Sequence, residues 1–184
     1  MIPAIVLAAG SGRRMGGPKA LLVIEGETLL HRTVRTAISA GCNPVIAVVG
    51  DWDPGPLDSS AILVHNRGAA EGMASSIHAG ILALPPASEA AFILAVDQPA
   101  VNADLLGRLL ALAAKDPDRP AACAYGESLG IPAVLPRRLF KDLLELRGDC
   151  GAKSILLREN TASLSFPEGA LDLDTPEDLD RIRR

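Results

Sequence analysis

Short apolar runs and longer amphipathic stretches alternate along this chain. The runs 2–9, 44–50 and 91–97 are almost continuously apolar, which is typical of strands buried on both faces of a parallel sheet. Between them, apolar residues recur every three or four positions, as they do on one face of a helix. This alternation predicts an α/β fold, in which right-handed crossovers build a mostly parallel, Rossmann-like sheet with helices on both faces.

Turn and capping residues indicate where the elements begin and end. Gly41 follows the helix expected over 28–40, and Asn102 is placed to cap a helix that runs to Lys115. A helix opens after Gly72. The other expected strands are 61–65, 120–125, a shorter one at 131–135 and 162–166, with the segments 137–146 and 151–160 between the last two. With 184 residues, we expect 1–184 to form a single domain.

Composition and charge indicate a small-molecule partner. The net charge is −4 and the arginines and lysines are scattered, whereas a nucleic-acid surface needs a concentrated basic patch. No apolar run reaches the ~20 residues that cross a membrane, and no basic leader precedes the opening run, so we expect neither a membrane span nor a signal peptide. Cys42, Cys123 and Cys150 form no Cys-x-x-Cys pair, which favours reduced thiols in a cytoplasmic protein.

The first candidate for chemistry is the stretch LAAGSGRRMGGPKALL, residues 7–22, directly after the first apolar run. Its glycines allow backbone N–H groups to approach a ligand closely and to form a concave anion site. Arg13, Arg14 and Lys19 add positive charge. The stretch therefore predicts a polyphosphate site, although a glycine turn with incidental surface charges would also explain it.

Two common phosphate-binding motifs do not fit this loop. A P-loop ends in Gly-Lys-Ser/Thr, but here Pro18 precedes Lys19 and Ala20 follows it. A dinucleotide-binding Gly-x-Gly-x-x-Gly that starts at Gly10 would need glycine where the chain has Met15. The loop is therefore neither a P-loop nor a dinucleotide fingerprint.

Carboxylates form the second candidate group. Asp97 follows the apolar run 91–96, and the carboxyl ends of parallel strands share one edge of a sheet, where ligands bind. Asp172 and Asp174 precede a helix start at Thr175. Two carboxylates that meet at a phosphate loop would hold Mg²⁺, which prefers oxygen ligands and shares its shell with phosphates. A loop-start aspartate is the plainer interpretation of Asp97, and a capped terminal helix explains Thr175 to Asp178 but not Asp172 and Asp174.

The loop and five later segments together resemble the nucleotidyltransferases that activate molybdopterin. The later segments are NRGAAEGMASSIHAG, AVDQPAV, GIPAVLPRRLF, LRGDCGAKSIL and DLDTPEDL, and the match covers nearly the whole chain. The reading LAAG with Pro18 before Lys19 is most similar to the cytidylyltransferase branch, because guanylyltransferase relatives usually have LAGG and an aspartate before the lysine. The resemblance implies a single-domain fold of the nucleotide-diphospho-sugar transferase type.

The resemblance also implies a reaction and its residues. A phosphate monoester attacks the α-phosphorus of CTP and releases pyrophosphate. The implied catalytic residues are Arg14, Lys19 and Asp97, and the implied Mg²⁺ ligands are Asp97 and Asp174, the latter preferred to Asp172 because it directly precedes the Thr-Pro-Glu turn. Nucleotide contacts are expected from Leu7, Ala8, Ala9, Gly10, Gly12, Arg13, Arg14, Gly16, Lys19, Gly72, Ser75 and Ser76.

Several of these expectations have alternatives. Ser75 and Ser76 open a helix, where serine is common without any ligand. The expected acceptor is molybdopterin, with a molybdoenzyme as a receiver of the product, and with 130–136 and Lys153 on the acceptor side. The alternatives are GTP or another triphosphate, a different phosphorylated acceptor, or a non-catalytic nucleotide-binding module. A nicotinamide-dependent oxidoreductase is disfavoured because Met15 breaks the fingerprint.

Overall fold

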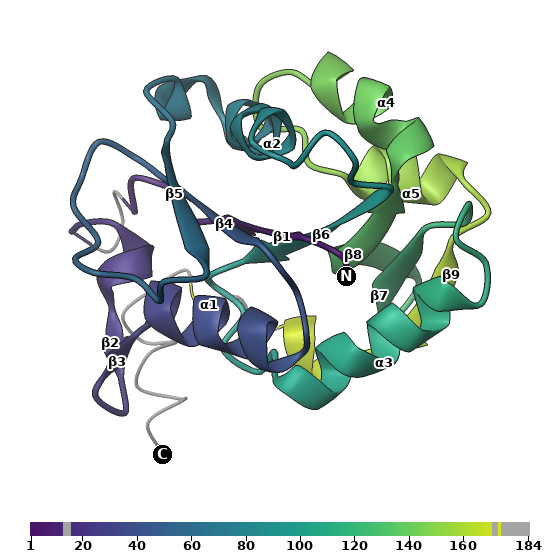
Figure 1. The fold of residues 1–184 in the computed structure, drawn as a ribbon, viewed down its shortest axis with the longest axis horizontal. Coiled ribbons are helices and arrows are strands. Elements are labelled where there is room, and N and C mark those ends of the chain that lie inside the picture. Colours follow the sequence, from purple (N-terminus) through teal and green to yellow (C-terminus); the bar gives the residue numbers. More distant parts are fainter. Residues whose placement is uncertain (13–15, 171–172, 174–184) are drawn as a thin grey trace.

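A computed structural model describes residues 1–12, 16–170 and 173 of the chain. Within these residues, one seven-stranded sheet has the order β5-β4-β1-β6-β8-β7-β9 (Figure 1). The strands are β1 (Ala4–Leu7), β4 (Val45–Val49), β5 (Ala61–His65), β6 (Ala90–Ala95), β7 (Ala121–Tyr125), β8 (Ser128–Pro136) and β9 (Ala162–Ser165).

The sheet is mostly parallel, as the alternating pattern predicts. β1 pairs in parallel with both β4 and β6, and β5 continues this parallel half beyond β4. β8 differs from the short strand expected at 131–135, because it spans nine residues and runs antiparallel to both β6 and β7. Pairing with β7 extends it backwards to Ser128, across a tight turn from Tyr125. The amino end of β8 therefore lies at the same edge as the carboxyl ends of β1 and β6.

Helices cover both faces of the sheet (Figure 1). One face carries α1 (Leu29–Ser39) and α3 (Ala103–Ala114), and the other carries α2 (Met73–Leu82), α4 (Phe140–Glu145) and α5 (Lys153–Arg158). The caps are set by the sequence: the Thr28 hydroxyl accepts from the His31 N–H, and the Asn102 side chain accepts from the Leu105 N–H.

Two hydrophobic clusters on opposite sides of the sheet explain why its central strands are apolar at every position. On β1, Ala4 and Val6 belong to the cluster under α1 and α3, whereas Ile5 and Leu7 belong to the cluster under α2, α4 and α5. Helix α2 approaches β1 closely, because a Cβ on Gly80 would lie 2.3 Å from the Ile5 Cγ2 atom. This close approach brings the start of α2 to the end of β1.

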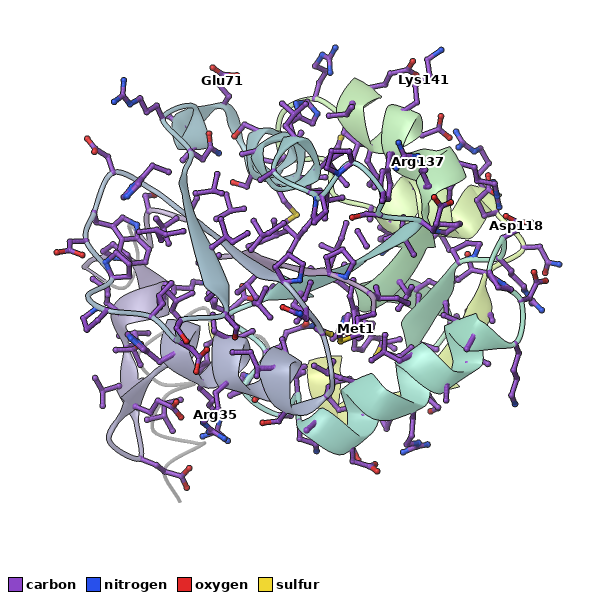
Figure 2. All side chains as sticks on the ribbon, in the orientation of Figure 1. Met1, Arg35, Glu71, Asp118, Arg137 and Lys141 are labelled. Carbon is purple, nitrogen blue, oxygen red and sulfur yellow. The ribbon has the colours of Figure 1, made fainter. Side chains whose placement is uncertain are left out.

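The remaining described elements are short. A two-stranded sheet joins β2 (Val23–Ile24) to β3 (Glu27–Thr28), and 3₁₀ turns form η2 (Lys19–Leu21), η3 (Ala69–Glu71), η4 (Arg137–Leu139) and η5 (Pro167–Ala170). Figure 2 shows the labelled charged side chains Arg35, Glu71, Asp118 and Lys141 at the periphery of the molecule, away from the sheet. Among the described residues, no helix is long and apolar enough to cross a bilayer.

Candidate functional site

A cleft of about 950 Å³ opens where β1 and β6 end. These strands are parallel neighbours, so the residues after Leu7 and after Ala95 emerge side by side. The antiparallel β8 begins at the same edge and adds a further part of the wall. The lining residues are 7–12, Lys19, Ala20, Ala69, Ala70, Gly72, Met73, Ser76, 95–98, 129–131, Asp149, Gly151 and Lys153.

The floor of the cleft offers mainly backbone. Leu7, Ala8 and Ala9 are each less than a tenth exposed, and the Ala8 N–H is already donated to the Val48 carbonyl at 2.8 Å. Gly10 follows them and is exposed. With small or buried side chains here, a ligand meets peptide groups and the surface of Ala9 rather than long side chains.

The glycine loop closes on itself beside this floor. Gly17 donates its N–H to the Gly12 carbonyl at 3.4 Å, and Gly12 has a φ of 55°, in the left-handed region that favours glycine. A Cβ on Gly12 would lie 1.9 Å from the Gly17 carbonyl oxygen. Position 12 therefore requires glycine. Gly16 is exposed, with a φ of 76°, while Arg13 and Arg14 lie outside the described residues.

Lys19 and Asp97 meet at this end of the cleft. The Lys19 Nζ lies 3.7 Å from the Asp97 Oδ2, and the two side chains are 21% and 31% exposed. Lys19 is held by the η2 turn, whose next residue, Ala20, is buried in the core. An ion pair of this exposure contributes at most about 1 kcal/mol to stability, so it is a weak structural contact. It presents a cation and a carboxylate together to a ligand in the cleft.

The segment after β9 also reaches Asp97. Leu173 is fully buried and donates its N–H to the Asp97 carbonyl oxygen at 2.9 Å. Asp172, Asp174 and the expected helix start at Thr175 lie outside the described residues. The structure thus brings to Asp97 the residue that directly precedes the expected second metal ligand.

On the opposite wall, two expected nucleotide contacts are serines with different surroundings. The Ser75 hydroxyl donates towards the carbonyls of Gly68 and Gly72, at 2.9 and 2.8 Å, and accepts from the Asn66 side chain. Ser76 lines the cleft and also accepts from Asn66, at 3.0 Å. Asn66, which the sequence did not single out, therefore organises this wall. Its position directly after the strand 61–65 is the signal that could have indicated it.

Gly72 joins this wall to the loop before α5. It has a φ of 107°, and a Cβ there would lie 2.4 Å from the Gly148 carbonyl oxygen and 2.7 Å from an Asp149 carboxylate oxygen. The Gly148 carbonyl accepts from the Ala74 N–H at 3.0 Å and so caps α2. This packing brings the loop before α5 to the cleft, where Asp149 and Lys153 both line it.

The three thiols take no part in this geometry. Cys42 and Cys123 are buried in the same hydrophobic cluster, and burial raises the pKa of each thiol to about 11. Cys150 is exposed on the loop before α5. No disulfide forms among the three, in agreement with the sequence-based expectation of reduced thiols.

Asp97 meets the donor requirement of a hard metal ion. Its carboxylate is accessible from the cleft and already lies beside one cation, Lys19. In the part of the chain that the structure describes, no three His, Cys, Asp or Glu residues form a group that could hold a metal ion. Mg²⁺ commonly uses one or two carboxylates and completes its shell with phosphates and water, so Asp97 fits such an ion.

The fold and the cleft together define a nucleotidyltransferase. The family model for the MobA-like NTP transferase domain matches residues 4–163, and the chain belongs to this family. Among curated relatives, nicotine blue oxidoreductase of Paenarthrobacter nicotinovorans is 31% identical over 100% of this chain and 94% of its own. A molybdenum cofactor guanylyltransferase of Rhodobacter capsulatus is 30% identical over 100% and 97%.

Solved structures agree with the fold. Rv0371c from Mycobacterium tuberculosis H37Rv superposes with a TM-score of 0.80 at 25% identity, covering 100% of this chain and 98% of that one. A nucleotidyl transferase from Methanothermobacter thermautotroptrophicus gives a TM-score of 0.79 at 28% identity, covering 100% and 96%. A second structure of the mycobacterial protein, in complex with manganese, has a TM-score of 0.76 at 25% identity and covers 98% of this chain and 97% of that one.

Proposed function

We propose that the protein transfers CMP from CTP to the terminal phosphate of molybdopterin and releases pyrophosphate. The observation that carries this proposal is the position of the Lys19–Asp97 pair, 3.7 Å apart in one cleft with the closed glycine loop. A phosphoryl donor needs a cation at the leaving group and an anionic metal holder at the reacting phosphorus, and both are side by side here.

Each part of the nucleotide has a proposed partner in the chain. The backbone of Ala8, Ala9 and Gly10 receives the base and ribose, and the loop from Gly12 to Gly16 surrounds the β- and γ-phosphates. Leu7 supports the floor. Arg13, Arg14 and Lys19 neutralise the triphosphate, and Gly72, Ser75 and Ser76 bound the base side. For Ser75 this contact is indirect, since its hydroxyl is engaged with Asn66, Gly68 and Gly72.

The transfer step is an in-line displacement. An acceptor phosphate oxygen forms a bond to the α-phosphorus, the bond between that phosphorus and the α–β bridging oxygen breaks, and the electron pair leaves with pyrophosphate. Lys19 stabilises the charge that grows on the leaving group, and Arg14 is proposed to act with it. Catalysis of this kind is positioning and charge neutralisation, with no covalent enzyme intermediate.

Mg²⁺ is the proposed metal, held by Asp97 and Asp174. Asp174 directly follows Leu173, whose N–H donates to the Asp97 carbonyl oxygen at 2.9 Å, and this contact supports the pairing of the two residues. Bound there, the ion would polarise the α-phosphate and offset the charge of both substrates. The manganese complex of the mycobacterial protein supports a divalent metal in this fold.

The acceptor is proposed to bind between the start of β8 and the loop before α5. Leu129 and Ile131 provide apolar surface there, and Lys153 provides a second positive charge in the same cleft. An apolar wall with one cation suits a flat heterocycle that carries a phosphate, such as molybdopterin. The product would then pass to a molybdoenzyme.

The choice of CTP over GTP rests on the LAAG loop and on Ala9 in particular. Ala9 lines the cleft, and its small methyl group, which also belongs to the cluster under α2, is the side chain that a glycine would remove there. The guanylyltransferase name of the Rhodobacter relative makes GTP the direct competitor.

The experiment is a panel of CTP, GTP, ATP and UTP with molybdopterin as acceptor, with release of pyrophosphate as the measurement. We expect turnover with CTP that depends on both acceptor and Mg²⁺. Turnover with GTP alone would show that GTP, not CTP, is the substrate, and the proposed nucleotidyl transfer would still stand. Binding of CTP and Mg²⁺ without turnover on any phosphorylated acceptor would indicate a nucleotide-binding module instead.

A second candidate function is favoured by one comparison. The relative from Paenarthrobacter nicotinovorans, which matches this chain from end to end, is named an oxidoreductase. A hydride-transfer enzyme needs bound nicotinamide rather than a Lys–Asp pair at a triphosphate. Oxidation of NADPH, followed by absorbance at about 340 nm with quinonoid dyes as acceptors, tests this second candidate. Steady oxidation that the Asp97→Ala variant retains would support this candidate over the transferase.

A further inference from the structure

One hydrogen-bonded junction links three segments around the Asp97 end of the cleft. Gln98, the residue after Asp97, donates its side-chain amide to the Tyr125 hydroxyl oxygen at 3.1 Å and to the Gly169 carbonyl at 3.3 Å. The Tyr125 hydroxyl in turn donates to the Ile131 carbonyl. These four residues, called here the Tyr125 junction, connect the end of β6, the start of β8 and the η5 turn after β9.

The chemistry of the partners fixes the orientation of Gln98. A carbonyl oxygen can only accept, so the amide nitrogen must face Gly169. The Tyr125 oxygen then accepts from Gln98 and keeps its own proton for the Ile131 carbonyl. The junction is therefore directional, and loss of either side chain leaves carbonyl groups without their donors.

Close packing reinforces these bonds. The rings of Tyr125 and Phe166 lie 6.1 Å apart between centroids. A Cβ on Gly169 would lie 2.2 Å from the Phe166 ring and 2.6 Å from the Tyr125 ring, and one on Gly130 would lie 3.1 Å from the Tyr125 ring. The η5 turn and the start of β8 therefore both rest on Tyr125.

The backbone connects the Tyr125 junction to Asp97, at the proposed metal site. Three residues after η5, Leu173 donates its N–H to the Asp97 carbonyl, and Asp97 directly precedes Gln98. We propose that Gln98 and Tyr125 are positioning residues, which hold the η5 turn and Leu173 against the end of β6 and so fix the position of Asp97 for metal binding. This inference rests on the proposed metal site of the transferase.

The test uses Tyr125→Phe, which removes one hydroxyl group and keeps the ring, and Gln98→Leu. We expect the Kd for Mn²⁺ in the presence of CTP to rise by about tenfold or more, since loss of groups that orient ligands typically costs ten- to a hundredfold in metal affinity. We also expect the Leu173 amide to exchange its hydrogen at least about tenfold faster, because its partner is no longer held in place. CTP affinity without metal should stay the same in Tyr125→Phe, because Tyr125 is not among the residues that line the cleft.

Thr161→Val is the matched control. It also removes a single hydroxyl, one that donates to the Leu156 carbonyl at 2.7 Å, and it lies just before β9, at the end of that strand away from the junction. A general loss of stability would affect this variant equally. A specific positioning role predicts that it keeps the Mn²⁺ affinity and the Leu173 exchange rate of the unmodified protein.

The outcomes separate this inference from the proposed function. If the unmodified protein binds Mn²⁺ with CTP and the two junction variants bind it equally well, the positioning role is wrong while the transferase remains. Unchanged exchange at Leu173 would overturn it in the same way. If the unmodified protein binds no metal, the proposed metal site fails, and the inference fails with it for that distinct reason.

Discussion

Among the described residues, Asp97 is the carboxylate that stands beside Lys19 at the floor of the cleft. Replacing Asp97 by Ala should lower kcat by about 10²–10³-fold at saturating Mg²⁺, a loss of about 3–4 kcal/mol in transition-state stabilisation. The thermal midpoint should change little, because the ion pair is partly exposed. The control is Asp104→Ala, which removes the exposed carboxylate 3.8 Å from Arg108 on α3. Near wild-type turnover in the Asp97 variant would remove Asp97 from the mechanism.

The methyl group of Ala9 gives a second prediction for a single residue. If it limits the space for the base, Ala9→Gly should shift the ratio of kcat/KM for CTP and GTP towards GTP by about tenfold or more, the usual worth of one methyl group in a pocket. Rates with both nucleotides measure the ratio directly. Ala70→Gly removes a methyl from the opposite wall and should leave the ratio as it is. A ratio that does not move would show that base selection lies elsewhere.

At the scale of elements, the contact between α2 and the loop before α5 joins the proposed base side of the cleft to the proposed acceptor side. Gly72→Ala would drive a Cβ to 2.4 Å from the Gly148 carbonyl at a φ of 107°, so either the loop or the start of α2 must move. We expect a loss of about 1–3 kcal/mol in the free energy of unfolding and a higher KM for the acceptor. Urea denaturation and acceptor titration measure the two effects.

The control for this prediction lies in α3. Gly107 has open space where a Cβ would be, so Gly107→Ala should stabilise the protein by about 0.5–1 kcal/mol and leave the KM unchanged. If Gly72→Ala is as stable and as active as Gly107→Ala, the tight packing between Gly72 and Gly148 is not a requirement of the site.

Elements with a local signal were predictable from the sequence. The strand expected at 61–65 coincides with β5, the helix expected after Gly72 is α2, and the expected cap Asn102 precedes α3. β8 was underestimated, because the residues before Ile131 carry no apolar run. They become a strand only by pairing with Tyr125 and its neighbours, a contact that no pattern within the strand itself encodes.

The candidate site also has parts that a local sequence signal predicts and parts that depend on contacts between distant segments. The glycine loop and Asp97 each follow a buried strand, so topology alone brings them to one edge of the sheet. The wall made by Asp149 and Lys153 depends on how Gly148 packs against Gly72, and the role of Gln98 depends on Tyr125 and Gly169. These are contacts between segments distant in sequence, and a single chain gives no periodic or spacing signal for them.

The two buried thiols bear on the stability of the whole molecule at alkaline pH. Burial raises the pKa of Cys42 and Cys123 from 9.0 to about 11. Between these values the unfolded chain has lost the protons that the folded protein keeps, so this stabilisation is complete below pH 9 and declines as pH rises to about 11. We expect the free energy of unfolding in urea to fall over this range, and to fall less steeply in a Cys42→Ala, Cys123→Ala variant. Equal slopes would contradict the assignment.

The continuity of the sheet leads to a prediction for the molecule as one unit. One sheet, with β5 and β9 at its two edges, contains seven of the described strands. Both hydrophobic clusters include residues of its strands β1, β4 and β6. Neither cluster can therefore be exposed without disrupting the strands that carry the other, and we expect 1–184 to unfold as one domain in one cooperative transition.

Trp52 makes this expectation measurable. It is the only tryptophan of the chain, it packs against the cluster under α1 and α3, and a Cβ on Gly50 would lie 2.9 Å from its Nε1 atom. Its fluorescence reports the β4 end of the sheet, whereas far-ultraviolet circular dichroism reports all helices, including α4 and α5 near the opposite edge. In urea, both signals should give the same midpoint and the same slope. Two separate midpoints would mean that the β7–β9 side unfolds independently, and the single-domain interpretation of 1–184 would then be wrong.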